Sequence, residues 1–217
     1  MKENTRKIIT ELVERYPALV SAEADILKAL EEIIKVYQNG GKILVCGNGG
    51  SAADSLHIVG ELVKSFRRKR PINAEIRKRL EVEFPEDAER FVQCLEGAMP
   101  AISLVSEVSL ITAFSNDKEA VFAYAQQVYG QGVENDVLIG ISTSGNAENV
   151  VLASKMARVK GMKVIAMTGE GGGKLKNLSD VCICAPSKET YIIQEYHLPI
   201  YHALCAAVEI ELFGGEE

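Results

Sequence analysis

The sequence predicts an α/β fold, a three-layer αβα sandwich built around a mainly parallel sheet of five strands. Five short apolar runs alternate with segments of helical periodicity, at 43–46, 101–105, 137–141, 163–167 and 181–185. Runs that are apolar throughout are typical of strands buried on both faces. Strands that alternate with helices in this way form parallel sheets with helices on both sides.

Length and composition favour a single domain over residues 1–217, since 217 residues suffice for one substantial α/β domain or two small ones. The net charge of −6 argues against a general nucleic-acid-binding protein. No apolar stretch reaches membrane-spanning length, and the charged N-terminus is unlike a signal sequence. The five cysteines follow no disulfide or zinc-finger spacing, so we expect a reduced, cytoplasmic protein.

The segments between the strands are predicted to be helical. Residues 1–39 form an N-terminal helical arm of two helices, which break near Tyr16-Pro17. Residues 67–100 form a helical insertion, in which Asn73 caps one helix and a second helix covers 86–95. The other expected helices are 52–64, a stretch that ends at Asn116-Asp117, 118–129, 147–160, and 192–213, which Pro199 interrupts.

The stretch Gly41–Leu62 carries the clearest functional signal. Its strand is followed by Gly47-Asn48-Gly49-Gly50-Ser51, residues that tolerate φ > 0 and let backbone N–H groups approach a ligand. The next helix directs its free N–H groups and its positive dipole end at that loop. Together these parts make an anion site, most often for a phosphate. The alternative is a tight turn where only glycine fits, and the two interpretations have about equal weight.

A second loop of this kind, Ser142-Thr143-Ser144-Gly145-Asn146, follows the third strand of the chain. It offers hydroxyls, a glycine and a helix N-terminus at the sheet edge where parallel sheets bind their ligands. Its alternative interpretation is a helix N-cap with spare hydroxyls. The glycine loop lacks the GxGxxG pattern of a dinucleotide site, and the stretch at 169–174 lacks the spacing of a P-loop.

Candidate catalytic side chains lie on two predicted helices. His57 and Glu61 are four residues apart on one helix face, although such pairs are also common on ordinary surfaces. His202 follows Gln194 by eight residues, which is ~12 Å along a straight helix and too far for both to bind one metal ion. Either Pro199 changes this geometry, or Gln194 and His202 serve different chains of an oligomer.

Two further polar groups have simpler explanations that the sequence favours. Asn116-Asp117, placed near a helix start, is interpreted as an N-cap rather than as part of a site. The basic cluster Arg67–Arg70 is interpreted as a solvated helix face or a subunit contact rather than as a nucleic-acid surface.

Five motifs together resemble the SIS (sugar isomerase) domain family, and within it the phosphoheptose isomerases: GKILVCGNGGSAADSLHIVGEL, SND, VLIGISTSGNAENV, GMKVIAMTGEGGGKL and IQEYHLPIYH. The resemblance extends over residues 26–212. It implies a flavodoxin-like sandwich that assembles as a homotetramer with active sites between subunits. It also implies an isomerase that converts sedoheptulose 7-phosphate to D-glycero-D-manno-heptose 7-phosphate, towards nucleotide-activated heptose for surface glycans.

The resemblance also implies roles for individual residues. The sugar phosphate would be contacted by Asn48, Gly49, Gly50, Ser51, Glu61, Asn116, Asp117, Ser142, Thr143, Ser144 and Gln194, with the three hydroxyls at 142–144 on the phosphate. One Zn²⁺ ion per site would be bound by His57, Glu61, Gln194 and His202. Glu61 and His202 would also be the acid/base pair, with Glu61 suited to take a proton from carbon and His202 to move protons between oxygens.

The chain departs from the family pattern in three places. Ala147 stands where a Ser or Thr is usual, and Tyr191-Ile192 stands where an Asp-Arg pair often precedes the helical Gln194. The segment 73–100 is longer than in the basic isomerase, and we expect it to form a flap near the active-site edge. These departures leave the exact phosphosugar open.

Two other functions stay open on the sequence. The first is a non-catalytic SIS protein, either a sugar-phosphate sensor or an assembly factor, but such relatives tend to lack the equivalents of Glu61 and His202. The second is an isomerase of another phosphosugar. Those enzymes often carry extra regulatory domains, for which 217 residues leave no room.

Overall fold

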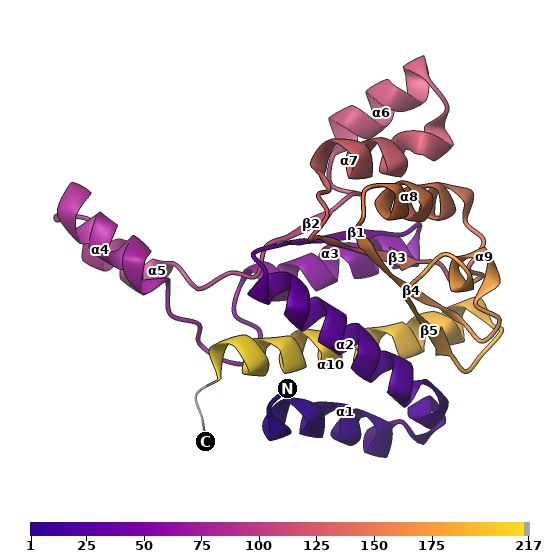
Figure 1. Cartoon of the computed structure of the whole chain (residues 1–217), viewed down its shortest axis with the longest axis horizontal. Helices are drawn as coiled ribbons and strands as arrows, with labels where there is room; N and C mark the ends of the chain where they lie inside the picture. Colours follow the sequence, from indigo (N-terminus) through magenta and orange to yellow (C-terminus); the bar gives the residue numbers. More distant parts are fainter. Residues whose placement is uncertain (215–217) are drawn as a thin grey trace.

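The computed structural model describes residues 1–214 and confirms the predicted sandwich (Figure 1). Across these residues the sheet has five strands, all parallel, in the order β2-β1-β3-β4-β5. The strands are β1 (Ile43–Cys46), β2 (Ala101–Ser103), β3 (Val137–Ile141), β4 (Lys163–Gly169) and β5 (Val181–Ala185). The strand order reverses at β1, so the sheet has its topological switch point between β1 and β3.

Helices connect the strands and cover both faces of the sheet. The α-helices are α1 (Glu3–Arg15), α2 (Glu23–Gln38), α3 (Gly50–Val63), α4 (Ala74–Glu83), α5 (Ala88–Cys94), α6 (Val108–Asp117), α7 (Ala123–Gln131), α8 (Glu148–Val159), α9 (Gly173–Lys176) and α10 (Thr190–Phe213). Two 3₁₀ helices, η1 (Pro17–Ala22) and η2 (Ala120–Phe122), precede α2 and α7. None of the helices within residues 1–214 is long and apolar enough to cross a membrane.

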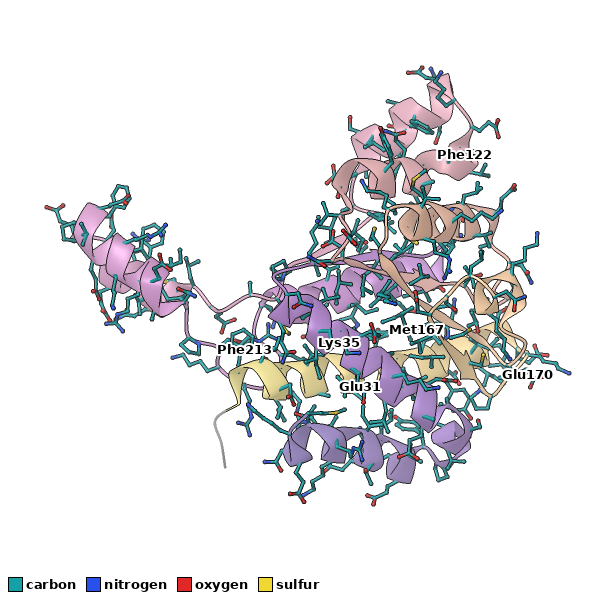
Figure 2. The ribbon with its side chains drawn as sticks, in the orientation of Figure 1. Glu31, Lys35, Phe122, Met167, Glu170 and Phe213 are labelled. Carbon is teal, nitrogen blue, oxygen red and sulfur yellow. The ribbon has the colours of Figure 1, made fainter. Side chains whose placement is uncertain are left out.

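Successive residues of each strand face opposite sides of the sheet. On β1, Ile43 and Val45 pack with α2, α3 and α10, whereas Leu44 and Cys46 pack with α7 and α8. Met167 on β4 belongs to the first side, and Figure 2 shows it in the interior of the molecule. Burial on both faces explains why the strands are apolar throughout.

The N-terminal helix α1 lies against α10 (Figure 1). The backbone N–H of Lys2 and the hydroxyl of Thr5 both donate to Glu211 Oε2, at 2.8 and 2.7 Å. Ile9 and Leu12 on α1 are fully buried. These contacts join the start of the chain to the domain, and the interpretation of residues 1–39 as an N-terminal arm of that domain stays a prediction.

The insertion forms two helices, α4 and α5, which stand apart from the rest of the molecule in Figure 1. Asn73 caps α4 as expected, because its side chain accepts hydrogen bonds from the N–H groups of Glu75 and Ile76. The base of the insertion lies beside Phe213, whose ring is 5.4 Å from the Arg70 guanidinium. Figure 2 shows Phe213 on the opposite side of the molecule from Glu170, which directly follows β4. Within one chain, then, the insertion lies away from the loop edge of the sheet, and its role as a flap stays a prediction.

Two local predictions were wrong. Pro199 does not interrupt the last helix, because α10 continues through it from Thr190 to Phe213. Burial of Ile200, Tyr201 and Leu204 around the proline offsets the lost backbone hydrogen bond, which costs about 3 kcal/mol. Asn116-Asp117 is not an N-cap either, because the pair forms the C-terminal end of α6.

Candidate active site

Two small-residue loops meet at the switch point of the sheet. The first follows β1 and leads into α3, with Gly49 at φ 55°, a left-handed conformation that favours glycine. The second follows β3 and leads into α8, with Gly145 at φ 66°. Because β1 and β3 are neighbours in the sheet, both loops leave the same edge side by side. This is the position at which parallel sheets bind their ligands.

The second loop is held in shape by its own hydroxyl groups. Ser142 is 6% exposed, and its Oγ accepts the N–H of Ala147 at 3.4 Å. Ser144 Oγ accepts the N–H of Asn146 at 3.2 Å. The hydroxyls therefore lie among the N–H groups that start α8, in the arrangement expected of an anion site.

A reciprocal amide pair joins the two loops. Asn48 Nδ2 donates to Asn149 Oδ1 at 2.9 Å, and Asn149 Nδ2 donates to Asn48 Oδ1 at 2.8 Å. Asn149 lies in the first turn of α8 and was not among the residues singled out in the sequence. No sequence signal links the two residues, because the pair exists only once β1 and β3 are neighbours.

His57, Glu61 and His202 come together within one chain. His57 Nε2 lies 3.1 Å from Glu61 Oε1 and 3.5 Å from His202 Nε2. The first two residues are one turn apart on α3, and α10 packs beside α3 and brings His202 to them. Burial, followed by the neighbouring His57, lowers the pKa of His202 below its ordinary value. A groove of about 520 Å³ between α1 and α10 borders His202.

The cluster gathers imidazole nitrogens and a carboxylate, which are groups that bind cations. Glu61 Oε2 is buried and has no hydrogen-bond partner. Two donor atoms ~2.1 Å from one tetrahedral zinc ion lie roughly 3.4 Å apart, close to the 3.1 and 3.5 Å found here. Two donor–donor distances in the cluster, from His57 to Glu61 and from His57 to His202, therefore match those of a tetrahedral site. Among residues 1–214 no group of three or more His, Cys, Asp or Glu side chains is arranged so that it could hold a metal ion.

Two residues behind His57 were missed by the sequence analysis. Tyr201 places its hydroxyl 2.9 Å from His57 Nδ1 and donates to Asp54 Oδ1 at 3.4 Å. Burial is the main cause that raises the pKa of both the Tyr201 phenol and the Asp54 carboxyl. In the sequence, Tyr201 resembles any core residue of an apolar helix, whereas Asp54 three residues before His57 on one helix face was a usable signal.

Gln194 lies with the glycine loop rather than with the His/Glu cluster. A Cβ added to Gly50 would come within 2.5 Å of Gln194 Nε2, so the amide lies directly against the start of α3 and a larger residue at position 50 would displace it. His57 is seven residues further along α3, ~10 Å along the axis. The continuous α10 does not bring Gln194 to His202, and the assignment of Gln194 as a zinc ligand stays a prediction.

Asn116 and Asp117 are candidate residues that lie outside both loops and outside the His/Glu cluster. They are exposed at the end of α6, and the amide of Asn116 donates to Asp117 Oδ1 at 3.0 Å. In Figure 1, α6 stands on the outer side of α7, away from the sheet. The structure of one chain therefore does not join this pair to the cluster, and their role in lining the sugar stays a prediction.

One member of the basic cluster is part of the domain core. Arg70 is 1% exposed and pairs with the buried Glu209 of α10, with Nε 2.7 Å from Oε1. Its other nitrogens donate to the carbonyls of Leu62 and Glu61, at 2.6 and 2.9 Å. The Glu209 carboxylate also accepts the backbone N–H groups of Phe66, Arg67 and Arg68. This network fixes the end of α3 that carries Glu61.

Comparison with known proteins agrees with this architecture. The sequence profile of the SIS domain matches residues 8–90 and 83–169 of the chain. The phosphoheptose isomerase of Akkermansia muciniphila is 36% identical over 215 residues, which are 99% of this chain and 100% of that protein. Phosphoheptose isomerase 2 of Campylobacter jejuni is 41% identical over 189 residues, 87% of this chain and 81% of that protein.

A solved structure leads to the same grouping. The phosphoheptose isomerase GmhA from Neisseria gonorrhoeae superposes with a TM-score of 0.71 at 32% identity, covering 94% of this chain and 97% of that one. The profile match covers more than half of the chain, and the relatives match nearly end to end. The switch-point loops, the parallel sheet and these similarities together place the chain in the SIS domain family.

Proposed function

We propose that this chain is a phosphoheptose isomerase that interconverts sedoheptulose 7-phosphate and D-glycero-D-manno-heptose 7-phosphate. The observation that carries the proposal is the placement of Glu61 beside His202, through His57, in a chain 36–41% identical to proteins of that name. A carboxylate next to a histidine of lowered pKa supplies the base and the proton carrier that an aldose–ketose isomerisation needs.

The reaction moves one proton between carbons and one between oxygens. Glu61 takes the proton from C1 of the ketose, next to the C2 carbonyl, and an enediolate forms. Glu61 then returns that proton to C2, while His202 carries a proton from O1 to O2, which leaves the aldehyde at C1. Because His202 is neutral near neutral pH, it is able both to accept and to donate.

The phosphate is assigned to the Ser142–Ser144 loop and the start of α8, and the glycine loop with Asn48 to the sugar. These interactions bind a part of the substrate that does not react. Their role is to hold C1 and C2 at Glu61, which lowers the entropic cost of the chemical step.

We also propose one Zn²⁺ ion per site, with His57, Glu61 and His202 as ligands and Gln194 as a fourth. The orphaned Glu61 Oε2 and the spacing of the donor atoms support this assignment. When bound, the ion would polarise the carbonyl and stabilise the enediolate oxygen as a Lewis acid. An amide is a weaker ligand than imidazole or carboxylate, so Gln194 contributes least.

The spacing along α3 supports an assembly in which two subunits share each site. Ser51 and Glu61 are ten residues apart, ~15 Å along the helix. An extended chain advances roughly 1.2 Å per bond, so the seven bonds from C2 to the phosphorus span about 8 Å. Loops and acid/base pair from neighbouring chains of a homotetramer would remove this mismatch. We propose a cytoplasmic location as well, since all five cysteines are free.

One assay tests the proposed function. Purified protein is incubated with sedoheptulose 7-phosphate, and the product is followed by NMR with and without a chelator. Conversion that the chelator abolishes and Zn²⁺ restores is the expected result. Binding of the sugar phosphate without conversion would instead favour a sensor. Conversion of a different phosphosugar, and not of sedoheptulose 7-phosphate, would show that the assigned substrate is wrong.

A further inference from the structure

The edge strand β5 carries two of the five cysteines, Cys182 and Cys184. They are two residues apart, so both side chains point from the same face of the sheet. Both are partly exposed, whereas the other three residues of the strand are buried. Within residues 1–214, β5 pairs only with β4. The two thiols therefore lie side by side at a border of the sheet, within reach of solvent.

The two sulfur atoms are in contact. Cys182 Sγ lies 3.7 Å from Cys184 Sγ. The hydroxyl oxygen of Thr168, which is opposite Cys184 on β4, lies 3.6 Å from each sulfur. All five cysteines are free, and the other three lie on β1, α5 and α10. This is therefore the one pair of cysteines that shares an element.

The geometry disfavours a disulfide between Cys182 and Cys184. Alternate residues of a strand have Cα atoms ~6.6 Å apart. That is close to the upper end of the range for disulfides, roughly 6.8 Å, and a disulfide also requires sulfur atoms ~2.05 Å apart. The strand would have to distort to close the sulfur–sulfur distance. A single atom that bridges the two sulfurs needs no such movement.

The protonation state of the pair also limits its chemistry. Burial raises the pKa of Cys182 to about 11, so this thiol keeps its proton at neutral pH. Alkylation and disulfide exchange use the thiolate, so a protonated thiol reacts slowly in both. A thiophilic oxide is less restricted, because its oxygen takes up the thiol protons as the sulfur bonds form. Trivalent arsenic oxides are reagents of this kind.

We propose that Cys182 and Cys184 form a dithiol site for trivalent arsenic, which bridges the two sulfurs. An arsenoxide, R–As=O, reacts with both thiols to give R–As(S–Cys)₂ and one water. Two As–S bonds form, the bonding between arsenic and oxygen breaks, and the oxygen leaves with both thiol protons. Arsenic stays trivalent, so no oxidant or reductant is needed. The soft sulfur atoms suit this thiophilic element.

The dithiol is separate from the proposed active site. Cys182 packs with the residues on the α7 and α8 side of the sheet. His57, Glu61 and His202 come from α3 and α10, which cover the other face. The dithiol therefore binds arsenic whether or not the His/Glu cluster holds a metal ion.

Phenylarsine oxide is the probe, and intact-protein mass spectrometry is the readout. Purified protein is treated with the reagent and then with excess glutathione, a monothiol that removes arsenic held by one sulfur. We expect one adduct per wild-type chain, with the mass of the reagent minus one water, and its release by ethanedithiol. The adduct should map to the peptide that contains both Cys182 and Cys184.

Serine variants test the need for both sulfurs. In Cys182→Ser and in Cys184→Ser, arsenic is left with one sulfur and loses the second bond, which forms within the molecule. We expect retention to weaken by about 10²–10⁴-fold, measured as the glutathione concentration that releases half of the arsenic. Cys94→Ser, on exposed α5, is the matched control and should behave as wild type.

Wild-type protein that loses all its arsenic to glutathione would overturn the proposal. So would an adduct that survives in either β5 variant or maps to another peptide. If a serine variant folds poorly, the peptide map of the wild-type adduct decides by itself. None of these measurements uses isomerase activity, so failure here leaves the proposed function untouched.

Discussion

The two halves of α3 hold their functional groups by different means. At its start, two loops contribute backbone N–H groups, hydroxyls and a reciprocal pair of amides. The hydroxyls of Ser142 and Ser144 accept N–H groups two to five residues further along the chain. Further along, His57 contacts side chains of α10 that are more than 140 residues away in the sequence, and Glu61 contacts His57. Under the proposed function the loop end binds the substrate and the cluster end reacts with it, so variants at the two ends should separate KM from kcat.

The largest effect is expected at Glu61. Glu61→Gln keeps the shape of the side chain but removes the base, so kcat should fall by roughly 10²–10⁴ with little change in KM. His202→Ala should lower kcat by a similar factor while the fold is retained. Steady-state kinetics with zinc content measured alongside checks this, and Glu83→Gln on exposed α4 is the control. Near-wild-type kcat in Glu61→Gln would remove Glu61 from the mechanism.

The second-largest effect, on stability, is expected for the buried Arg70–Glu209 ion pair, which supports the end of α3 that carries Glu61. Glu209→Gln leaves the Arg70 charge buried without its counterion, and breaking such a pair costs about 3–5 kcal/mol. Urea unfolding gives the change in the free energy of unfolding. Glu81→Gln removes an exposed pair with Arg77, about half exposed on each side, and should cost less than about 1 kcal/mol. Equal losses in the two variants would show that Arg70–Glu209 does not hold the end of α3.

A smaller effect is expected from His197, which lies on α10 between Gln194 and His202 in the sequence. Burial lowers its pKa from 6.5 to about 4, so between these values the unfolded chain takes up a proton that the folded chain does not. The free energy of unfolding should therefore fall as the pH drops through this window, by about 3 kcal/mol in total. Unfolding curves across this pH range should show the loss in wild type and not in His197→Leu. Parallel curves for both proteins would contradict the prediction.

The smallest effect is expected at the loop end. Ser142→Ala removes one hydroxyl from the phosphate loop, and a hydrogen bond to a charged group contributes about 1.5–3 kcal/mol. KM for the sugar phosphate should rise about tenfold or more, while kcat stays within about twofold of wild type if this loop only binds. Ser21→Ala, an exposed position in η1, is the matched control. A fall in kcat at constant KM would contradict the prediction that the loop end only binds the substrate.

Much of the loop end was predictable because its information is local. Strand, glycine loop and helix start are consecutive in the chain, and the backbone of Gly49 requires a φ that glycine favours. The five strands were placed within two residues at each end, because burial on both faces leaves a continuous apolar run. His57 and Glu61 were also predictable as a pair, since helical spacing alone puts them on one face.

The errors arose where distant contacts override local preference. Pro199 disfavours a helix by itself, yet packing of the residues after it keeps α10 continuous. Arg70 belongs to a basic run that suggests a solvated surface, but it is buried in the core because it forms an ion pair with Glu209, which is 139 residues later in the chain. Neither outcome has a signal within its own stretch of sequence.

By itself the sequence determined the parallel sheet, the two small-residue loops at one edge and the candidate pair on α3, because each follows from periodicity or from the conformational freedom of neighbouring residues. Only the tertiary structure decided that His202 meets His57, that Tyr201 and Asp54 stand behind it, and that Gln194 lies over Gly50 instead. The physical reason is that these contacts depend on how α10 packs across α3, and side-chain packing between distant helices has no local code.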